Sequence, residues 1–285
     1  MRLVYGEPVN ALNISDRKKG LLAAVLTATC WSFLSLFLKF ALKYSDSYTI
    51  VWYRMFVASL VLLIWFIWSN KTQDLKVLTI KPGLMLIGAL CLAFNYVGFM
   101  QGVHFTSPAS AQIFIQLGPL LLAVAGLVVF KEKLSAKQKM GFIFCFIGFG
   151  FFFWDRIIMT QNSDQNFLLG FAWIMAAAVT WAAFATFQKK LLQQWNSSQI
   201  NIYIYMVSSL IYLPIVNWQN LINLPVELHF FYVFLGLNTV VAYGCLSIAL
   251  KYLPATQVSP IITLNPLFTL FLINVIAFMD WSFIP

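Results

Sequence analysis

Long apolar stretches, separated by short polar segments, run along almost the whole chain. Nine of them come close to or exceed the about 20 residues that a helix needs to cross a bilayer. They cover residues 20–42, 49–69, 83–105, 108–130, 136–154, 167–189, 199–217, 229–251 and 255–278. Too little sequence remains between them for a soluble domain. The pattern therefore predicts one all-α polytopic membrane domain, preceded by a cytoplasmic N-terminal tail at residues 1–16.

The chain also contains an internal repeat. Residues 20–63 align without a gap with residues 170–213, and a weaker alignment relates the fourth and ninth stretches. The matching pairs include Gly20 and Gly170, Trp31 and Trp181, Lys39 and Lys189, Tyr53 and Tyr203, and Pro119 and Pro266. Because five predicted helices separate the copies, the second copy enters the membrane from the opposite face. We therefore expect two inverted five-helix repeats, at residues 17–155 and 165–285, an arrangement typical of alternating-access transporters.

The second repeat is one predicted helix short. The counterpart of residues 136–154 would begin near residue 283, and the sequence ends at Pro285. We therefore expect four helices in the second repeat and nine transmembrane helices in this chain, with the tenth helix missing.

The formal net charge of +9 could suggest a nucleic-acid partner, but its distribution argues against one. Lysine and arginine gather before the first stretch and in alternate loops: Arg17, Lys18, Lys19, Lys71, Lys76, Lys81, Lys131, Lys133, Lys137, Lys139, Lys189, Lys190 and Lys251. This is the positive-inside pattern, which predicts a cytoplasmic N-terminus. The charge then favours contact with the lipid bilayer over nucleic acid.

Acidic residues are absent from every predicted span. They lie at positions 7, 16, 46, 74, 132, 155, 164, 227 and 280. Proton-coupled carriers usually keep an intramembrane carboxylate, so the pattern favours a facilitator or exchanger. The same pattern disfavours a simple cation as substrate, because no buried anion awaits it. Neutral, zwitterionic or aromatic metabolites fit better, with amino acids as the leading class.

The sequence offers little for catalysis or cofactor binding. Cys30, Cys91, Cys145 and Cys245 all lie inside apolar stretches, which predicts buried thiols instead of disulfides or a metal cluster. An HExxH-type pair is lacking. We therefore expect no enzyme activity, no metal and no cofactor.

Several of these features together resemble the EamA-type members of the drug/metabolite transporter superfamily. They are the paired Trp31 and Trp181, Arg54 early in the second stretch, Gly102 to Phe105, the mid-helix Pro119 and Pro266, and the turn at residues 130–135. The second unit departs from the family pattern at Ile204, where the first has Arg54. The resemblance implies a transporter of the bacterial cytoplasmic (inner) membrane. It also implies export of amino acids or drugs, or import of nucleotide-like metabolites.

Two aromatic residues are candidates for substrate binding. Trp31 and Trp181 are repeat equivalents and lie near the middle of their helices, where a tryptophan with polar neighbours suits stacking against an organic solute. Simple packing is the alternative.

Polar residues in the fourth and ninth stretches form a second candidate set. Gln112, Gln116 and Pro119 share one helix face, with Ser259, Thr263 and Pro266 as counterparts, and Asn95 lies inside the third stretch. These amides and hydroxyls either line a wet cavity or hold helices together. The prolines, with Pro260, predict broken helices beside the transport path.

Four further residues are expected to have ordinary roles. Lys39 is interpreted as snorkelling to the surface and Arg54 as interfacial. His104 and His229 lie at helix ends and receive no role.

These features predict an inner-membrane metabolite transporter, either monomeric or a weak homodimer, that moves small solutes by alternating access. A nucleotide importer and a multidrug exporter are alternatives within this class. A non-transporting membrane scaffold or sensor is the alternative from another class.

Overall fold

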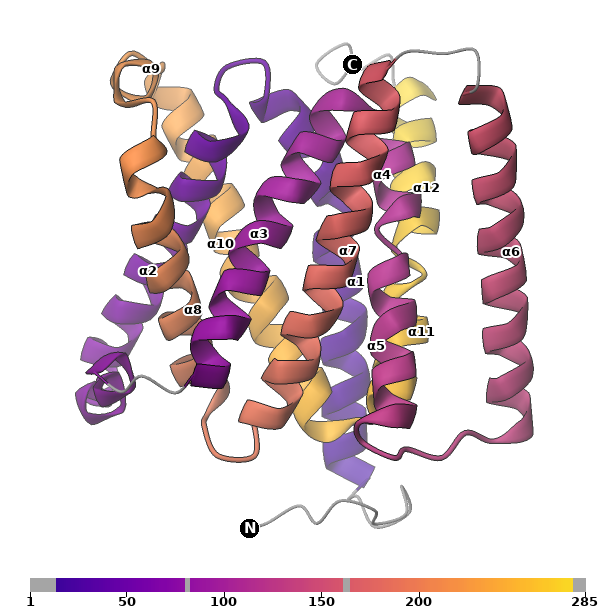
Figure 1. The fold of residues 1–285 in the computed structure, drawn as a ribbon. Helices are drawn as coiled ribbons and strands as arrows, with labels where there is room; N and C mark the ends of the chain where they lie inside the picture. The colour runs from indigo at the N-terminus through magenta and orange to yellow at the C-terminus, as the bar shows by residue number, and fades with distance from the viewer. Residues whose placement is uncertain (1–13, 80–82, 161–164, 279–285) are drawn as a thin grey trace.

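The computed structural model describes residues 14–79, 83–160 and 165–278, which form an all-α bundle (Figure 1). The first half contains α1 (Ile14–Ala41), α2 (Ser47–Trp68), η2 (Thr72–Thr79), α3 (Gly83–Phe105), α4 (Pro108–Phe114), α5 (Leu117–Val128) and α6 (Ala136–Thr160). The second half contains α7 (Gln165–Leu191), α8 (Ser197–Tyr212), η3 (Leu213–Ile215), α9 (Trp218–Ile222), α10 (Val226–Tyr252), α11 (Ala255–Ile262) and α12 (Asn265–Phe278). Of the predicted tail, residues 14–16 already belong to α1, and residues 1–13 lie outside the described residues.

The two halves repeat the same helix boundaries. The ends of α1 and α7 and the starts of α2 and α8 fall at the spacing of the sequence repeat. Local capping explains the starts: Asp46 Oδ1 accepts from the backbone N–H of Thr49 at 3.0 Å, and Asn196 forms a capping box with Gln199. In Figure 1, α1 leads away from the end of the bundle where the N-terminus lies, and α7 leads back toward it. The two copies are therefore inverted, as predicted.

The fourth and ninth predicted helices are each broken in two. Residues 115–116 separate α4 from α5, and residues 263–264 separate α11 from α12. Pro119 and Pro266 lie in the first turns of α5 and α12, where a proline sacrifices no helical hydrogen bond. Pro260 lies inside α11. The breaks therefore fall just before Pro119 and Pro266, at repeat-equivalent places.

Close packing of α3 against α7 joins the two repeats. Gly98 and Gly102, four residues apart on α3, face α7 without a side chain between the backbones. A Cβ atom on Gly98 would lie 3.0 Å from the Cβ of Ala177, and one on Gly102 would overlap the side chain of Ile174. Small residues at such spacing let membrane helices approach closely.

Seven segments of the described chain are long and apolar enough to cross a membrane. They are α1, α2, α3, α7, α10, the α4–α5 pair and residues 255–272 of the α11–α12 pair. The helices α6 and α8 complete the nine predicted stretches but do not belong to these seven, so the count of nine crossings stays a prediction. The expected turn before a tenth helix lies within residues 279–285, outside the described residues.

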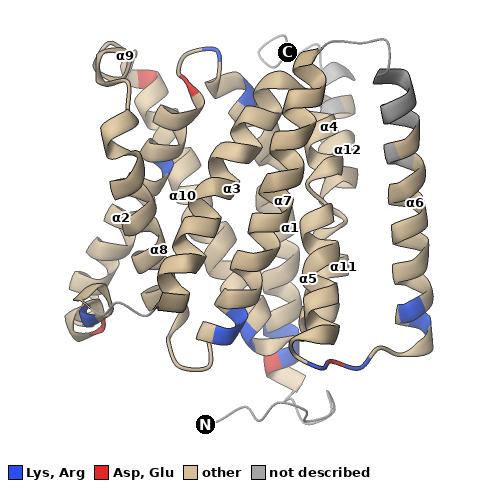
Figure 2. Cartoon of the chain, in the orientation of Figure 1, with Lys and Arg blue, Asp and Glu red and all other residues tan. Residues whose placement is uncertain are grey.

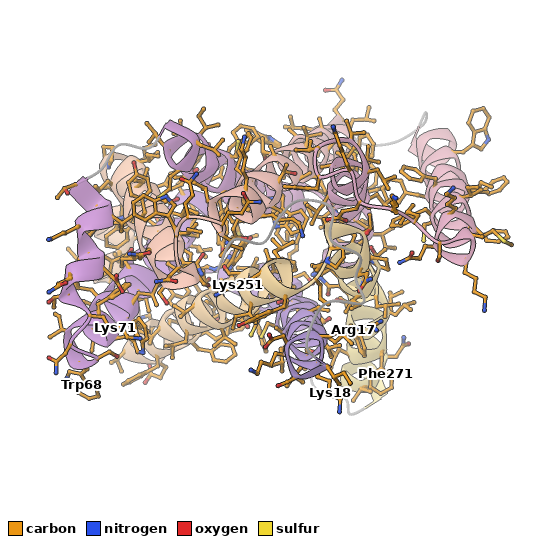
Figure 3. All side chains as sticks on the ribbon, turned by 90° about the horizontal axis from the view of Figure 1, so that it is seen from below. Arg17, Lys18, Trp68, Lys71, Lys251 and Phe271 are labelled. Atoms are coloured by element: carbon orange, nitrogen blue, oxygen red, sulfur yellow. The ribbon has the colours of Figure 1, made fainter. Side chains whose placement is uncertain are left out.

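Lys and Arg residues gather mainly at the end of the bundle where the N-terminus lies, called the N-terminal end below, whereas the opposite end carries fewer charged residues, some of them acidic (Figure 2). Seen from this end, Arg17, Lys18, Lys71 and Lys251 surround the helix ends, and α6 stands at the edge of the bundle (Figure 3). This arrangement agrees with the alternation of charge in the sequence. The assignment of this end to the cytoplasm stays a prediction.

Candidate functional site

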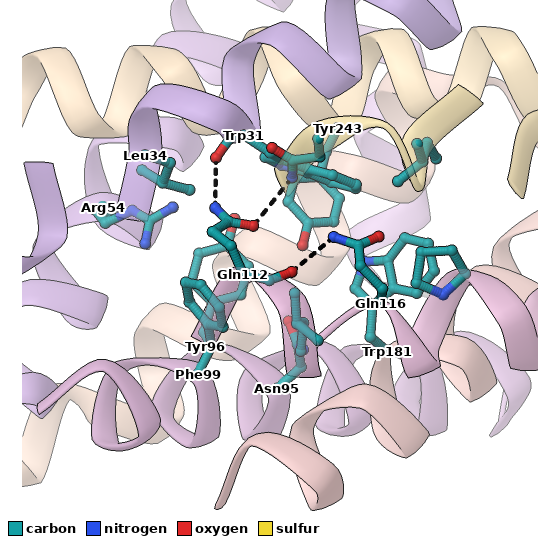
Figure 4. Close-up of a pocket in the computed structure, with 14 residues that line it drawn as sticks. Trp31, Leu34, Arg54, Asn95, Tyr96, Phe99, Gln112, Gln116, Trp181 and Tyr243 are labelled. Carbon is teal, nitrogen blue, oxygen red and sulfur yellow. Dashed lines mark hydrogen bonds between the residues drawn. The ribbon is translucent and has the colours of Figure 1, made fainter. Parts of the chain in front are cut away.

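A cavity lies between the two repeats, beside the breaks in the paired helices (Figure 4). Its volume is about 590 Å³, including the part that opens to solvent. Its lining residues come from both repeats: Trp31, Leu34, Arg54, Asn95, Tyr96, Phe99, Gln112, Ile115, Gln116, Pro119, Trp181, Tyr243, Ile262 and Asn265. This lining of aromatic rings and a few polar groups is typical of sites for small organic ligands.

Aromatic rings form much of the cavity wall. Trp31 and Trp181, the repeat equivalents, contact each other edge to face with ring centroids 5.7 Å apart. The ring of Tyr243 lies 5.4 Å from that of Trp31 and 5.8 Å from that of Tyr96. Edge-to-face pairs fix the orientation of the rings. The helices α1, α3, α7 and α10 therefore present one continuous aromatic surface.

Side-chain amides occupy the break between α4 and α5. The backbone N–H of Gln116 donates to the carbonyl of Ile113. The regular helical acceptor, the carbonyl of Gln112, accepts from the side-chain amide of Gln116 at 2.9 Å. Gln112 in turn donates to the carbonyl of Trp31 at 2.9 Å and accepts from the amide of Asn265 at 3.2 Å. These bonds tie the two broken helices and α1 together at the cavity.

Two amide oxygens at this place remain available. Gln116 Oε1 and Asn265 Oδ1 are buried and accept no hydrogen bond from the described part of the chain. Buried polar atoms are nearly always bonded, so such atoms beside a cavity are candidates to bind a ligand or water. Sequence reasoning missed Asn265, although an amide next to Pro266 in an apolar stretch was a usable signal.

The other predicted site residues lie elsewhere or have other partners. Asn95 lines the cavity but donates to the carbonyl of Ala177 at 2.9 Å, which joins α3 to α7. Ser259, Thr263, Pro260 and Pro266 are not among the lining residues, and the Thr263 hydroxyl donates to the carbonyl of Ser259 at 2.8 Å. Pro119 does line the cavity.

Arg54 differs most from its sequence-based interpretation. It was expected at the interface, but its side chain is 2% exposed and lines the cavity. The cause is its depth: eight residues into α2, at a rise of about 1.5 Å per residue, Arg54 is well inside the bundle. Its Nη2 donates to the Thr239 hydroxyl at 3.2 Å, and its guanidinium carbon lies 4.6 Å from the ring centroid of Tyr96. A charged side chain at mid-membrane costs at least about 2.5–3.5 kcal/mol, so a buried arginine inside the bundle is a candidate functional residue.

A partly buried ion pair joins the repeats at the N-terminal end. The carboxylate of Glu132, in the loop after α5, lies 3.4 Å from Lys189 Nζ on α7. It also accepts from the backbone N–H groups of Ala255 and Thr256 at 2.8 and 2.9 Å, at the start of α11. Lys189 donates to the carbonyl of Leu253 at 2.8 Å. We call Glu132, Lys189 and these two N–H groups the Glu132 latch.

The opposite end repeats part of this geometry. Lys39, the equivalent of Lys189, donates to the carbonyl of Val103 near the end of α3 at 3.0 Å. Lys189 donates in the same way to a carbonyl at the end of α10. Lys39 is thus partly buried and does not simply snorkel. The repeat partner of Glu132 lies beyond Phe278, outside the described residues.

None of the four cysteines is among the residues that line the cavity. Cys30, Cys91 and Cys245 are free and half-buried, whereas Cys145 is exposed, so its predicted burial was wrong. The reason is that Cys145 lies on α6, at the edge of the bundle. Residues 14–79, 83–160 and 165–278 contain no cluster of three or more His, Cys, Asp or Glu suited to a metal.

Comparison with known proteins decides the family. The EamA-like transporter family matches this chain twice, at residues 18–154 and 168–278. The chain belongs to the EamA-like transporter family. The two matches coincide with the two inverted repeats, so this EamA-like transporter consists of one family unit per repeat.

Two bacterial relatives are similar over most of their length. This EamA-like transporter is 32% identical over 251 residues to an uncharacterized transporter of Haemophilus influenzae, covering 88% of this chain and 82% of that protein. It is 31% identical over 261 residues to the uncharacterized inner membrane transporter YhbE of Escherichia coli K12, covering 90% and 81%. A solved crystal structure with 16% identity superposes with a TM-score of 0.68 over 92% of this chain and 90% of its own, which shows the same fold. The protein is therefore a multi-pass inner-membrane transporter of the EamA type.

Proposed function

We propose that this EamA-like transporter moves amino acids, or similar small zwitterionic, neutral or aromatic solutes, and that they bind in the central cavity. The observation that carries the proposal is the contact of Trp31 with Trp181. Two residues related by the inverted repeat meet at one point and line one cavity. A site on the axis between inverted repeats stays in place while the halves move around it. The aromatic surface suits an apolar or aromatic side chain, and the amide oxygens of Gln116 and Asn265 suit hydrogen-bond donors.

The broken helices and the Glu132 latch supply the moving parts. The latch joins the loop after α5 to the start of α11, so it ties together the halves of the two broken helices that lie at the N-terminal end of the bundle. At the other end, α4 and α12 meet through Gln112 and Asn265 beside the cavity. Opening the latch while α4 and α12 close would expose the cavity to the other side of the membrane. This is alternating access by exchange of two nearly equivalent conformations.

We further propose facilitated transport or export without an intramembrane carboxylate relay. Apart from Asp155, which lies in the last part of α6 at the edge of the bundle, the carboxylates of the described chain lie at helix starts or in loops, and Glu132 is held in the latch. An imposed pH gradient across proteoliposomes should therefore leave the initial rate of amino-acid flux unchanged. A clear acceleration would contradict this part of the proposal.

Counterflow of a panel of radiolabelled amino acids in proteoliposomes tests the site. Trp31→Ala and Gln116→Ala should each lower the flux about 5- to 30-fold, because each removes a contact worth about 1–2 kcal/mol from the bound state. Trp68→Ala is the matched control, since Trp68 is 86% exposed at the end of α2 (Figure 3). The central-site proposal fails if both cavity variants fold, insert and transport like the wild type. Flux of nucleotides or of cationic drugs, but of no amino acid, would favour the other transporter classes. Absence of flux for every class would favour a scaffold or sensor.

A further inference from the structure

Arg54 is the only charged residue among those that line the central cavity. Its burial is nearly complete, yet its hydrogen-bonding capacity is not filled. Nη2 donates to Thr239, whereas Nε is buried without an acceptor anywhere in the described chain. The salt bridges found among the described residues do not include Arg54.

The neighbours of Arg54 stabilise a cation without neutralising it. Tyr96 presents its ring face to the guanidinium at 4.6 Å, an arrangement that attracts the charge through the ring quadrupole. Tyr205 is fully buried, and its hydroxyl donates to the carbonyl of Thr239. This bond holds α10, which carries the Thr239 hydroxyl that accepts from Arg54, against α8. None of these groups is a carboxylate. A guanidinium keeps its charge under all physiological conditions, so the cavity carries a permanent positive charge.

The direction of the side chain makes this charge accessible to a ligand. In Figure 4 the guanidinium of Arg54 projects from α2 toward the space around Gln112 and Tyr96. In the same view Gln116 lies on the other side of Gln112. One part of the cavity therefore offers a cation, and another part offers the free amide oxygens of Gln116 and Asn265.

We propose that Arg54 binds the carboxylate of the transported solute. The inference rests on the proposed function, because it assumes that the central cavity is the transport site. A planar guanidinium with free N–H groups is the preferred partner of a carboxylate, and the low dielectric of the cavity strengthens the attraction. The substrate class narrows accordingly, from neutral or zwitterionic solutes to those with a carboxylate, and an ammonium group would find acceptors in the amide oxygens.

Pairs of acids and amides test the proposal on the purified full-length chain. The probes are L-phenylalanine and L-phenylalanine amide, L-tryptophan and L-tryptophan amide, and inorganic phosphate. Each is titrated against the thermal stability of the protein, since a ligand raises the melting temperature by mass action. We expect each acid to bind about 10- to 100-fold more tightly than its amide, the effect of one hydrogen-bonded charge.

Variants assign the preference to Arg54. Arg54→Gln should abolish the preference for the acid over the amide and leave the affinity for the amide nearly unchanged. Arg54→Lys should retain part of the preference. Lys39→Gln is the matched control, because it removes a cation of α1 that does not line the cavity, and it should keep the full preference.

The outcomes separate this inference from the proposed function. Equal binding of acid and amide to the wild-type protein would overturn the role of Arg54 and leave the central site standing. An acid preference that survives in Arg54→Gln would do the same. Stabilisation by phosphate but not by either acid would overturn the carboxylate assignment in favour of phosphate-bearing substrates. Absence of binding by every probe, together with unchanged counterflow in Trp31→Ala, would refute the central site itself. If Arg54→Gln does not fold, Arg54→Lys carries the assignment, and a full acid preference in that variant would overturn the role of Arg54.

Discussion

Glu132→Gln is expected to open the N-terminal end of the bundle. The wild-type carboxylate forms an ion pair with Lys189 and accepts from Ala255, from Thr256 and from the Thr256 hydroxyl, at 2.8–2.9 Å for the hydrogen bonds. Glutamine keeps the size of the side chain, but it offers one oxygen and no charge. At least one of these acceptor bonds is then lost, and the attraction to Lys189 falls to that of a neutral dipole.

The magnitude follows from the number of charged contacts. A hydrogen bond to a charged group contributes about 1.5–3 kcal/mol, so we take the loss in the latched conformation as about 2–3 kcal/mol. This corresponds to a shift of about 30- to 150-fold in the equilibrium between the latched and the open conformation. An open conformation populated at about 1% would rise to about 25–60%.

Distances between spin labels measure this shift. Val129→Cys at the end of α5 and Lys251→Cys in the last turn of α10 are exposed positions on either side of the latch. The native Cys30, Cys91, Cys145 and Cys245 are replaced by serine. We expect one short distance with Glu132 present and an additional, longer distance in Glu132→Gln. Glu227→Gln, which removes an exposed carboxylate from the first turn of α10, is the control and should change nothing. Identical distance distributions in the two folded proteins, with and without Glu132, would refute the latch.

Two further predictions concern the α3–α7 interface. Gly102→Val should lower the stability by about 1–3 kcal/mol, because the new side chain overlaps Ile174, and a melting curve in detergent checks this. Gly148→Val on α6, where a Cβ meets nothing within 4 Å, is its control, and equal melting temperatures of the two variants would contradict the packing argument. Asn95→Leu should cost about 0.6–2 kcal/mol through loss of the hydrogen bond to the Ala177 carbonyl, measured in the same way. A stability unchanged within error would show that Asn95 faces the cavity more than the helix.

The sequence alone predicted the features that depend on neighbouring residues along the chain. The apolar stretches predicted the helices, because a backbone in lipid must satisfy its own hydrogen bonds. The repeat predicted the inverted pair of units, and Pro119 and Pro266 predicted the broken helices. All of these follow from local backbone chemistry and from the distance that a helix must span.

The tertiary structure decided which of these residues meet. Arg54 was taken for an interfacial residue because its position in α2 does not show that α3, α8 and α10 cover it. Glu132 lies in a loop by sequence, yet its carboxylate reaches the start of α11, more than a hundred residues away in the chain. Asn265 lines the cavity, whereas Ser259 and Thr263 are not among the lining residues. The break at residues 263–264 separates Ser259 in α11 from Asn265 in α12, so no single helical register relates the two positions. Helix periodicity therefore determined the elements of this protein, whereas the contacts between distant helices, which periodicity does not encode, determined its candidate site.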